Sequence, residues 1–196
     1  MKDDRHNTGV REHILATAQA IMNGKGFSAV GLNEILKASD VPKGSFYHYF
    51  RSKEEFGKAL LERYFETYLA AMDEIIARDD LTGAEKLLAY WGRWLDSQTA
   101  DDPQSKCLVV KLAAEVSDLS EAMRRVLLDG TGQITGRIAE MIEAGIADGS
   151  LRITGQPHHV ATSLYQSWLG ASLLAKITRD GTPLRAAMTE TRNTLG

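Results

Sequence analysis

The segment 42–50 brings together residue types that suit contact with a polyanion. Lys43 would place a positive charge at the start of a short helix, where free backbone N–H groups already favour a phosphate. Gly44 leaves room for close approach of another backbone. Hydrogen-bonding side chains follow at Ser45, Tyr47 and His48. This chemistry predicts nucleic-acid binding, and an aromatic helix that only packs against the core is the structural alternative.

A second candidate phosphate site follows directly in the chain. Ser52 and Glu55 have the spacing of a capping box, which predicts the start of a long helix. The free N–H groups near Ser52, together with Lys53, would hold another phosphate. The aromatic side chains at helical spacing in the preceding segment are predicted to face the core: Phe46, Tyr49 and Phe50.

Cys107 is the only cysteine, so an internal disulfide is excluded and a reducing compartment is expected. It follows a loop predicted at 101–106 from its Asp-Asp-Pro start at 101–103, close to a predicted helix start, with Lys106 beside it and Lys111 one turn on. A helix N-terminus and neighbouring cations both favour the reactive thiolate. The alternative is a small buried hydrophobic residue. A catalytic cysteine would need a base, and the only histidines in the C-terminal half, His158 and His159, belong to no supporting motif.

Aromatic residues recur at helical spacing in two later segments. They are Trp91, Trp94, Tyr165 and Trp168. These side chains either fill a helical core or line a pocket for a small apolar ligand, with Lys176 and the cysteine in segments within reach. The sequence leaves both alternatives open.

Apolar residues follow the period of an amphipathic helix almost throughout, and no segment shows sustained period-two alternation. Helices are predicted over about 10–22, 32–38, 42–50, 52–77, 82–95, 121–148 and 157–178, and again from 182. Asp40 falls at the turn between the second and third helices, where a left-handed or bridge conformation is often needed and Asp is tolerated better than most residues. Two further capping-box spacings occur, at Thr82–Glu85 and Asp118–Glu121. The predicted fold class is all-α.

The chain has 196 residues, of which 43% are hydrophobic and 25% charged, which indicates an ordinary folded protein of one or two domains. Residues 1–70 carry a net charge of +1 and residues 71–196 a net charge of −4. The segment that contains Lys43 and Lys53 is therefore locally basic within an acidic protein. No signal peptide or membrane-spanning run is visible, which predicts a cytoplasmic, nucleoid-associated protein without membrane contact. No metal site and no cofactor are expected, because one Cys and five scattered His offer no ligand spacing.

The string 41–54, Val-Pro-Lys-Gly-Ser-Phe-Tyr-His-Tyr-Phe-Arg-Ser-Lys-Glu, closely resembles the DNA-binding domain of TetR-type transcriptional repressors, as do residues 27–38 before it. The resemblance implies a three-helix helix-turn-helix domain over 8–53, with its third helix in the major groove, and a helical sensing and dimerisation domain over 54–196. It implies DNA contacts at Lys43, Gly44, Ser45, Tyr47, His48, Lys53, Ser28 and Asn33. The expected partners are a palindromic double-stranded operator, a second copy of the chain and a small-molecule effector.

Residues 105–120 and 168–177 resemble the N-ethylmaleimide-responsive, NemR-like members of that family. This resemblance implies a sensor of reactive electrophiles or oxidants, with Cys107 as the nucleophile and Lys176 as a partner that stabilises the thiolate or traps a sulfenic acid. Ser117 stands where such proteins often have a further cysteine, so no intramolecular disulfide switch is expected. The alternative is a repressor induced by a reversible apolar ligand in a Trp-lined pocket, with Cys107 structural.

The dimer interface is predicted on the helices at about 121–148 and 157–178. Two recognition helices one turn of DNA apart raise the affinity enough for a specific operator. Gly130, Gly132 and Gly136 are unexpected inside a helix, because each costs roughly 1 kcal/mol relative to Ala. Close approach of another helix would explain them.

Overall fold

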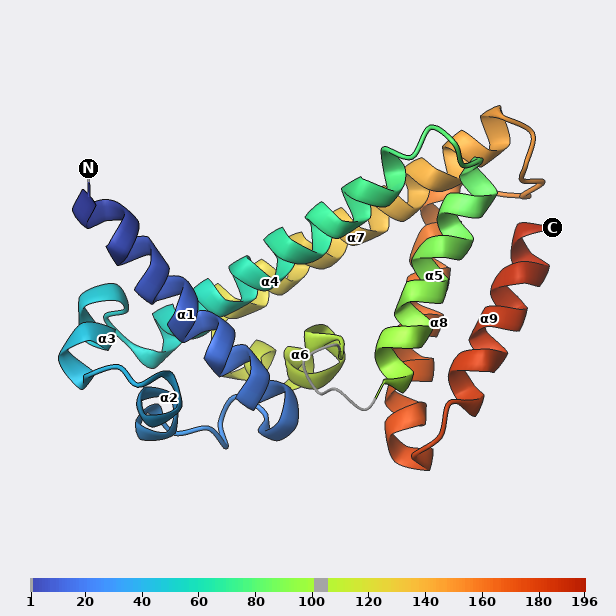
Figure 1. Ribbon diagram of the computed structural model, residues 1–196. Helices are drawn as coiled ribbons and strands as arrows, with labels where there is room; N and C mark the ends of the chain where they lie inside the picture. Colours follow the sequence, from blue (N-terminus) through green and yellow to red (C-terminus); the bar gives the residue numbers. More distant parts are fainter. Residues whose placement is uncertain (1, 101–105) are drawn as a thin grey trace. The chain divides into compact units, whose positions relative to one another are not determined.

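A computed structural model describes residues 2–100 and 106–196, which are helical between short turns (Figure 1). The helices are α1 (Lys2–Lys25), α2 (Leu32–Ser39), α3 (Lys43–Tyr49), α4 (Lys53–Ile76), α5 (Gly83–Thr99), α6 (Leu108–Leu119), α7 (Glu121–Ala147), α8 (Pro157–Thr178) and α9 (Thr182–Leu195). The all-α prediction is confirmed. The loop predicted at 101–103 lies outside the described residues.

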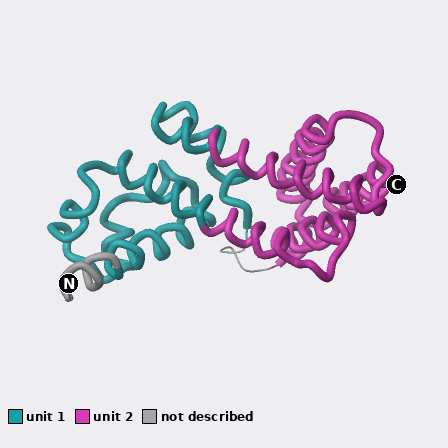
Figure 2. The backbone as a smooth tube through the Cα atoms, turned by 90° about the horizontal axis from the view of Figure 1, so that it is seen from above, with its two compact units in different colours: residues 1–66, 102–128 teal, residues 67–101, 129–196 magenta. Residues whose placement is uncertain are grey.

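Contacts divide the chain into two compact units (Figure 2). Unit 1 consists of Met1–Glu66 and Asp102–Leu128, and unit 2 of Thr67–Asp101 and Asp129–Gly196. Helices α4 and α7 each contribute one part to each unit. The functional boundary near residue 53 stays a prediction, because these units are defined by packing and not by activity.

In unit 1, tight turns fold α1, α2 and α3 against one another. Gly26 leaves α1 with φ +96°, a conformation that suits glycine. Asp40 joins α2 to α3 with φ 51° and ψ 43°, which confirms the left-handed conformation predicted for it. The apolar side chains buried in these helices are Ile14, Leu15, Ala18, Met22, Ile35 and Phe46.

In unit 2, α9 packs against both α8 and α5. The later parts of α4 and α7 lie side by side in both views (Figures 1 and 2), and Arg137 of α7 donates two hydrogen bonds to the carboxylate of Asp73 of α4, at 2.6 and 2.9 Å. This bidentate pair lowers the pKa of Asp73, mainly through the side-chain hydrogen bonds. The apolar core of the unit includes Leu87, Trp91, Ile138, Ile142, Leu164, Trp168 and Leu184.

The helix-capping predictions hold to different degrees. Thr82 and Glu85 form a complete capping box at the start of α5. Ser52 accepts from the backbone N–H of Glu55 at 3.0 Å, but the Glu55 carboxylate accepts from Arg51 instead of Ser52.

The capping box predicted from Asp118 to Glu121 is wrong. Asp118 lies in the last turn of α6, and Ser120 caps α7 by accepting the N–H of Met123 at 3.2 Å. A hydroxyl two residues further along is the acceptor used, because α6 extends through Leu119.

Two further helix boundaries differ from the sequence pattern. α1 begins at Lys2, eight residues before the apolar period starts at Val10, because no proline interrupts the polar residues between them. For α6 the sequence predicted only a helix start near Cys107, and the helix extends from Leu108 to Leu119. No helix in the described part of the chain combines the length and hydrophobicity needed to cross a membrane.

Within the protomer, a close approach of two helix backbones involves other glycines, and the approach predicted at Gly130, Gly132 and Gly136 in the dimer stays a prediction. A Cβ built on Gly132 or Gly136 would meet nothing within 4 Å. A Cβ on Gly83 would lie 2.1 Å from the backbone nitrogen of Gly145, so the start of α5 contacts the backbone of α7. Gly92, also on α5, faces open space.

Gly83→Ala should lower the free energy of unfolding by about 3 kcal/mol, at the upper end of overpacking effects, because the colliding atom is backbone and cannot rotate away. Gly92→Ala is the matched control on the same helix, and it should gain up to about 1 kcal/mol from helix propensity. Urea unfolding of both variants at one protein concentration measures the difference. Equal midpoints for the two variants would contradict the close contact.

Candidate nucleic-acid interface and sensing site

Helix α3 has one face in the core of unit 1. Phe46 and Phe50 are 0% and 1% exposed, and both rings pack on Phe56 with centroids 5.3 and 5.1 Å away. Tyr49 is half-buried at the edge of this cluster. The aromatic residues therefore fix the orientation of α3, as their spacing predicted.

The opposite face of α3 is open. Lys43, Gly44, Tyr47 and His48 are exposed and Ser45 is half-buried. Tyr47 keeps 48% of its surface exposed, and the Lys43 ammonium lies 6.0 Å from the centroid of its ring. A Cβ on Gly44 would meet nothing within 4 Å, so the helix surface there is free for a partner backbone. The structure thus groups five predicted site residues on one short helix.

The other three predicted DNA-contact residues lie around the start of α2 and α4. Asn33 is exposed in the first turn of α2, and Ser28 is exposed in the turn before it. Lys53 is half-buried, and its ammonium donates to the carbonyl oxygen of Phe27 at 3.0 Å and lies 4.8 Å from the Phe27 ring centroid. One ammonium has three N–H donors, so Lys53 keeps donors beyond this contact.

Glu115 is a residue that sequence reasoning missed. Its carboxylate accepts the backbone N–H of Phe27 at 3.0 Å through Oε2 and that of Ser28 at 2.7 Å through Oε1. Burial alone would raise the pKa of Glu115, but the hydrogen bonds from Ser28 and Phe27 and the charge of Lys53 outweigh it and hold the pKa below its ordinary value. The partners are 87 and 88 positions away in the sequence, so no local pattern could reveal them.

Cys107 lies at the N-terminus of α6 as the residue that precedes its first turn. Its side chain is 6% exposed, and the Tyr64 hydroxyl lies 3.5 Å from Sγ. The Lys111 ammonium, predicted to lie near the thiol, donates to the carbonyl oxygen of Gly24 at 3.1 Å. The helix N-terminus and Tyr64 are two groups that can favour a thiolate here, and the role predicted for Lys106 stays a prediction. Tyr64 had no signal in the sequence beyond its place on an apolar helix face.

The four predicted aromatic residues do come together in unit 2. Trp91 and Trp168 stack with centroids 4.7 Å apart and rings 12° from parallel, and Trp94 meets Tyr165 edge to face at 5.8 Å. All four side chains are buried.

Hydroxyl groups satisfy two of the indoles. Trp94 donates to Ser172 at 3.0 Å and Trp168 donates to Thr191 at 2.9 Å. Among the described residues, the Nε1 of buried Trp91 has no hydrogen-bond acceptor. The cluster is thus a packed aromatic core with one unmatched donor.

Lys176 is exposed near the end of α8. It belongs to unit 2, whereas Cys107 belongs to unit 1. Their pairing therefore stays a prediction. Within the described residues, no group of three His, Cys, Asp or Glu side chains is arranged to hold a metal ion.

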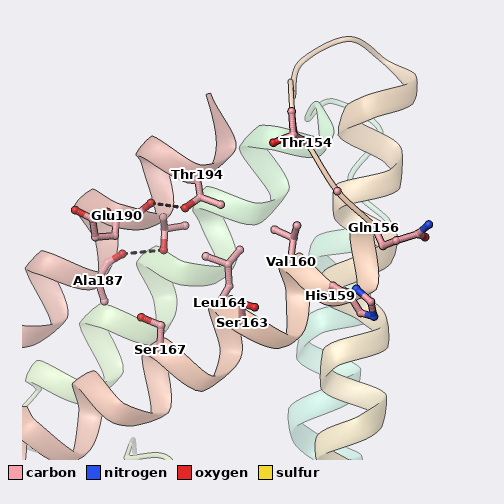
Figure 3. Close-up of a pocket in the computed structure, with 12 residues that line it drawn as sticks. Thr154, Gln156, His159, Val160, Ser163, Leu164, Ser167, Ala187, Glu190 and Thr194 are labelled. Atoms are coloured by element: carbon pink, nitrogen blue, oxygen red, sulfur yellow. Dashed lines mark hydrogen bonds between the residues drawn. The ribbon is translucent and has the colours of Figure 1, made fainter.

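A half-open groove of about 370 Å³ lies between α8, α9 and the loop before α8 (Figure 3). Polar and apolar side chains both line it, among them Thr154, His159, Val160, Leu164 and Glu190. None of the four aromatic residues lines it. The groove therefore differs from the Trp-lined apolar pocket that the alternative interpretation requires.

Comparison with known proteins agrees with this architecture. Residues 14–60 match the family described as bacterial regulatory proteins, tetR family, and residues 83–191 match the tetracyclin repressor-like C-terminal domain. The chain is 41% identical over 192 residues to the HTH-type transcriptional repressor NemR of Escherichia coli strain K12, covering 98% of this chain and 96% of that protein. It is 33% identical to the transcriptional regulator AcuR of Cereibacter sphaeroides, covering 83% and 74% of the two chains.

The crystal structure of reduced E. coli NemR superposes with a TM-score of 0.91 at 41% identity, covering 96% of this chain and 97% of that one. This chain therefore belongs to the TetR family of transcriptional regulators. It is a DNA-binding transcriptional repressor similar to NemR, and not an enzyme.

Lys43→Met should weaken operator binding and reduce the slope of log K against log salt concentration by about 1, because one phosphate contact is lost. Lys58→Met is the matched control, since Lys58 is exposed in the same unit and pairs with Glu62 at 3.3 Å. Fluorescence anisotropy with labelled operator at several salt concentrations measures both slopes. An unchanged slope for Lys43→Met would remove Lys43 from the interface.

Proposed function

We propose that this repressor releases a palindromic operator when a reactive electrophile or oxidant modifies Cys107. The position of the thiol carries the proposal: Cys107 precedes the first turn of α6, 3.5 Å from the Tyr64 hydroxyl. A helix N-terminus favours the thiolate, and Tyr64 can donate a hydrogen bond to it. The resemblance of residues 105–120 to N-ethylmaleimide-responsive repressors supports the same role.

The proposed chemistry of alkylation is a conjugate addition. The thiolate forms an S–C bond with the electrophilic alkene carbon, the alkene π bond breaks, and the resulting carbanion takes a proton from water. A two-electron oxidant such as a peroxide would instead convert the thiolate to sulfenic acid. The Lys176 amine is the proposed trap for that acid, forming an S–N bond and releasing water.

The proposed DNA interface consists of the open face of α3 and the residues at the starts of α2 and α4. Lys43, His48 and Lys53 are assigned to phosphates, and Ser45 and Tyr47 to base edges, because cations position the helix while polar tips read sequence. Gly44 allows close approach of the backbone. Ser28 and Asn33 complete the interface at the start of α2.

The proposed dimer uses the exposed face of α8. Leu173, Leu174 and Ile177 are 52%, 52% and 69% exposed, although all three are large and apolar. They lie on the same helix face as Gly170, which is also exposed. A Cβ built on Gly170 would meet no atom within 4 Å. An apolar helix stripe of this kind suits a second copy of itself across a two-fold axis.

A reversible effector is the second candidate, with Cys107 structural. The observation that favours it is the buried Trp91 Nε1, a donor without an acceptor among the described residues. A small ligand carrying a hydrogen-bond acceptor would satisfy this donor beside the stacked Trp168. In either case the effector acts by favouring a dimer whose recognition helices no longer match the half-site spacing.

Leu173→Glu should weaken the dimer about a hundredfold or more, because each copy places a carboxylate in an apolar contact. Leu119→Glu is the control, since Leu119 is 56% exposed on α6, outside this face. Sedimentation equilibrium gives both dissociation constants. A dimer that tolerates the charge at Leu173 would place the interface elsewhere.

Treatment with N-ethylmaleimide should weaken operator binding of the wild-type chain roughly 5–150-fold, the usual range of coupling between two sites. Cys107→Ser should bind the operator like the wild type and ignore the reagent, since the hydroxyl is far less nucleophilic. Binding assays with and without the reagent, with alkylation confirmed by mass spectrometry, measure the ratio. If the Ser variant releases DNA as the wild type does, Cys107 is not the sensor.

A further inference from the structure

We infer that Glu115 is a positioning residue that couples helix α6 to the DNA-binding helices, so that a change at Cys107 reaches α2 and α3 through its carboxylate. The link to Cys107 rests on the proposed function. The contact between Glu115 and the turn before α2 rests on the structure alone.

The α1–α2 turn depends on Glu115 because two of its donors lie outside any helix. Gly26 turns the chain out of α1, and the next two N–H groups, from Phe27 and Ser28, both point to the Glu115 carboxylate. A Cβ on Gly26 would lie 3.1 Å from Oε2, so the backbone fits closely around the acid. Two charge-assisted hydrogen bonds to one side chain set the position of the turn.

The same face of α6 makes a second contact with opposite charge. Lys111 lies one turn before Glu115 and donates to the carbonyl oxygen of Gly24 at 3.1 Å. Lys111 thus holds a carbonyl oxygen in the last turn of α1, while Glu115 holds two N–H donors of the turn that follows. A rotation or translation of α6 would break both contacts together.

Cys107 is well placed to move α6. It directly precedes the helix, is 6% exposed, and is followed by Leu108 and Val109, which are also buried. An adduct on this thiol has no room in a close-packed interior unless the helix shifts. Glu115 follows eight residues later, about 12 Å along the helix axis. A helix this short transmits the shift as a unit.

The turn that Glu115 holds leads directly into the DNA-binding helices. It carries Ser28 and ends at the start of α2, whose first turn carries Asn33. α2 packs against α3, which bears the open polar face. Loss of the carboxylate contact therefore changes the position of residues that must meet the DNA simultaneously.

Glu115→Gln tests the inference with almost no change in shape. The amide oxygen can accept one N–H, but its NH₂ group faces the other, so the pair of bonds is lost. Operator affinity of the unmodified protein should fall about tenfold, the effect of losing one charge-assisted hydrogen bond. The affinity ratio between unmodified and N-ethylmaleimide-treated protein should shrink toward one, because α6 no longer acts on the turn.

Asp118→Asn is the matched control. Asp118 is exposed on the same helix, so the variant removes the same charge without the contact, and it should keep the wild-type affinity and ratio. A merely structural role for Glu115 would lower affinity yet leave the N-ethylmaleimide ratio unchanged. That outcome, or wild-type behaviour of Glu115→Gln, overturns the inference.

Lys111→Met is the second variant, in case Glu115→Gln fails to fold. It removes only the Gly24 contact, and it should reduce the N-ethylmaleimide ratio partially, whereas a full wild-type ratio would contradict the coupling. Failure of Cys107 as the sensor is recognised separately, as wild-type protein that keeps its operator affinity after complete alkylation. That outcome overturns the proposed function and the step from Cys107 to α6 with it, and lower affinity of Glu115→Gln than of Asp118→Asn would then show only that Glu115 holds the α1–α2 turn.

Discussion

The structure of unit 1 depends on one carboxylate that accepts two consecutive backbone N–H groups. The turn between α1 and α2 leaves the helix at a glycine with positive φ, so its next donors have no helical partner. Glu115 supplies the acceptors, Lys53 donates to the carbonyl oxygen of Phe27 in the same turn at 3.0 Å, and Lys111 donates to that of Gly24 in the last turn of α1 at 3.1 Å. The DNA-binding helices are thereby fastened to α6 by charged groups instead of apolar packing alone. Contacts of this kind can be broken by a small shift, which suits a repressor that must alternate between two states.

The sequence predicted the parts of the site that depend on local pattern. The spacing of Phe46 and Phe50 predicted that one face of α3 is buried, and the structure confirms it. Lys43, Tyr47 and His48 are exposed on the other face. Helical spacing also singled out Trp91, Trp94, Tyr165 and Trp168, whose rings contact one another in the structure. Periodicity identifies which side of a helix is buried, and here that was enough to predict the buried face of α3 and the helix faces that carry the aromatic core.

The rest depends on contacts between distant segments, which no local pattern contains. Ser172 and Thr191 accept from two buried indoles, and Tyr64 meets Cys107, because folding brings their helices together. Gly132 and Gly136 on α7 face open space within the protomer, whereas Gly83 and Gly145 make the close contact. Contacts also group α6 and Cys107 with the DNA-binding helices in unit 1, although the chain order had assigned them to the sensing half.

In the proposed mechanism, the state of Cys107 reaches the DNA-binding helices through α6. Hydrogen exchange of the Phe27 and Ser28 amides, followed by NMR in the wild-type protein with and without complete N-ethylmaleimide alkylation, tests it most directly. Both amides should be protected in the unmodified protein, because each donates to Glu115, and both should exchange markedly faster after alkylation. Unchanged protection of the two amides in fully alkylated protein would contradict the claim.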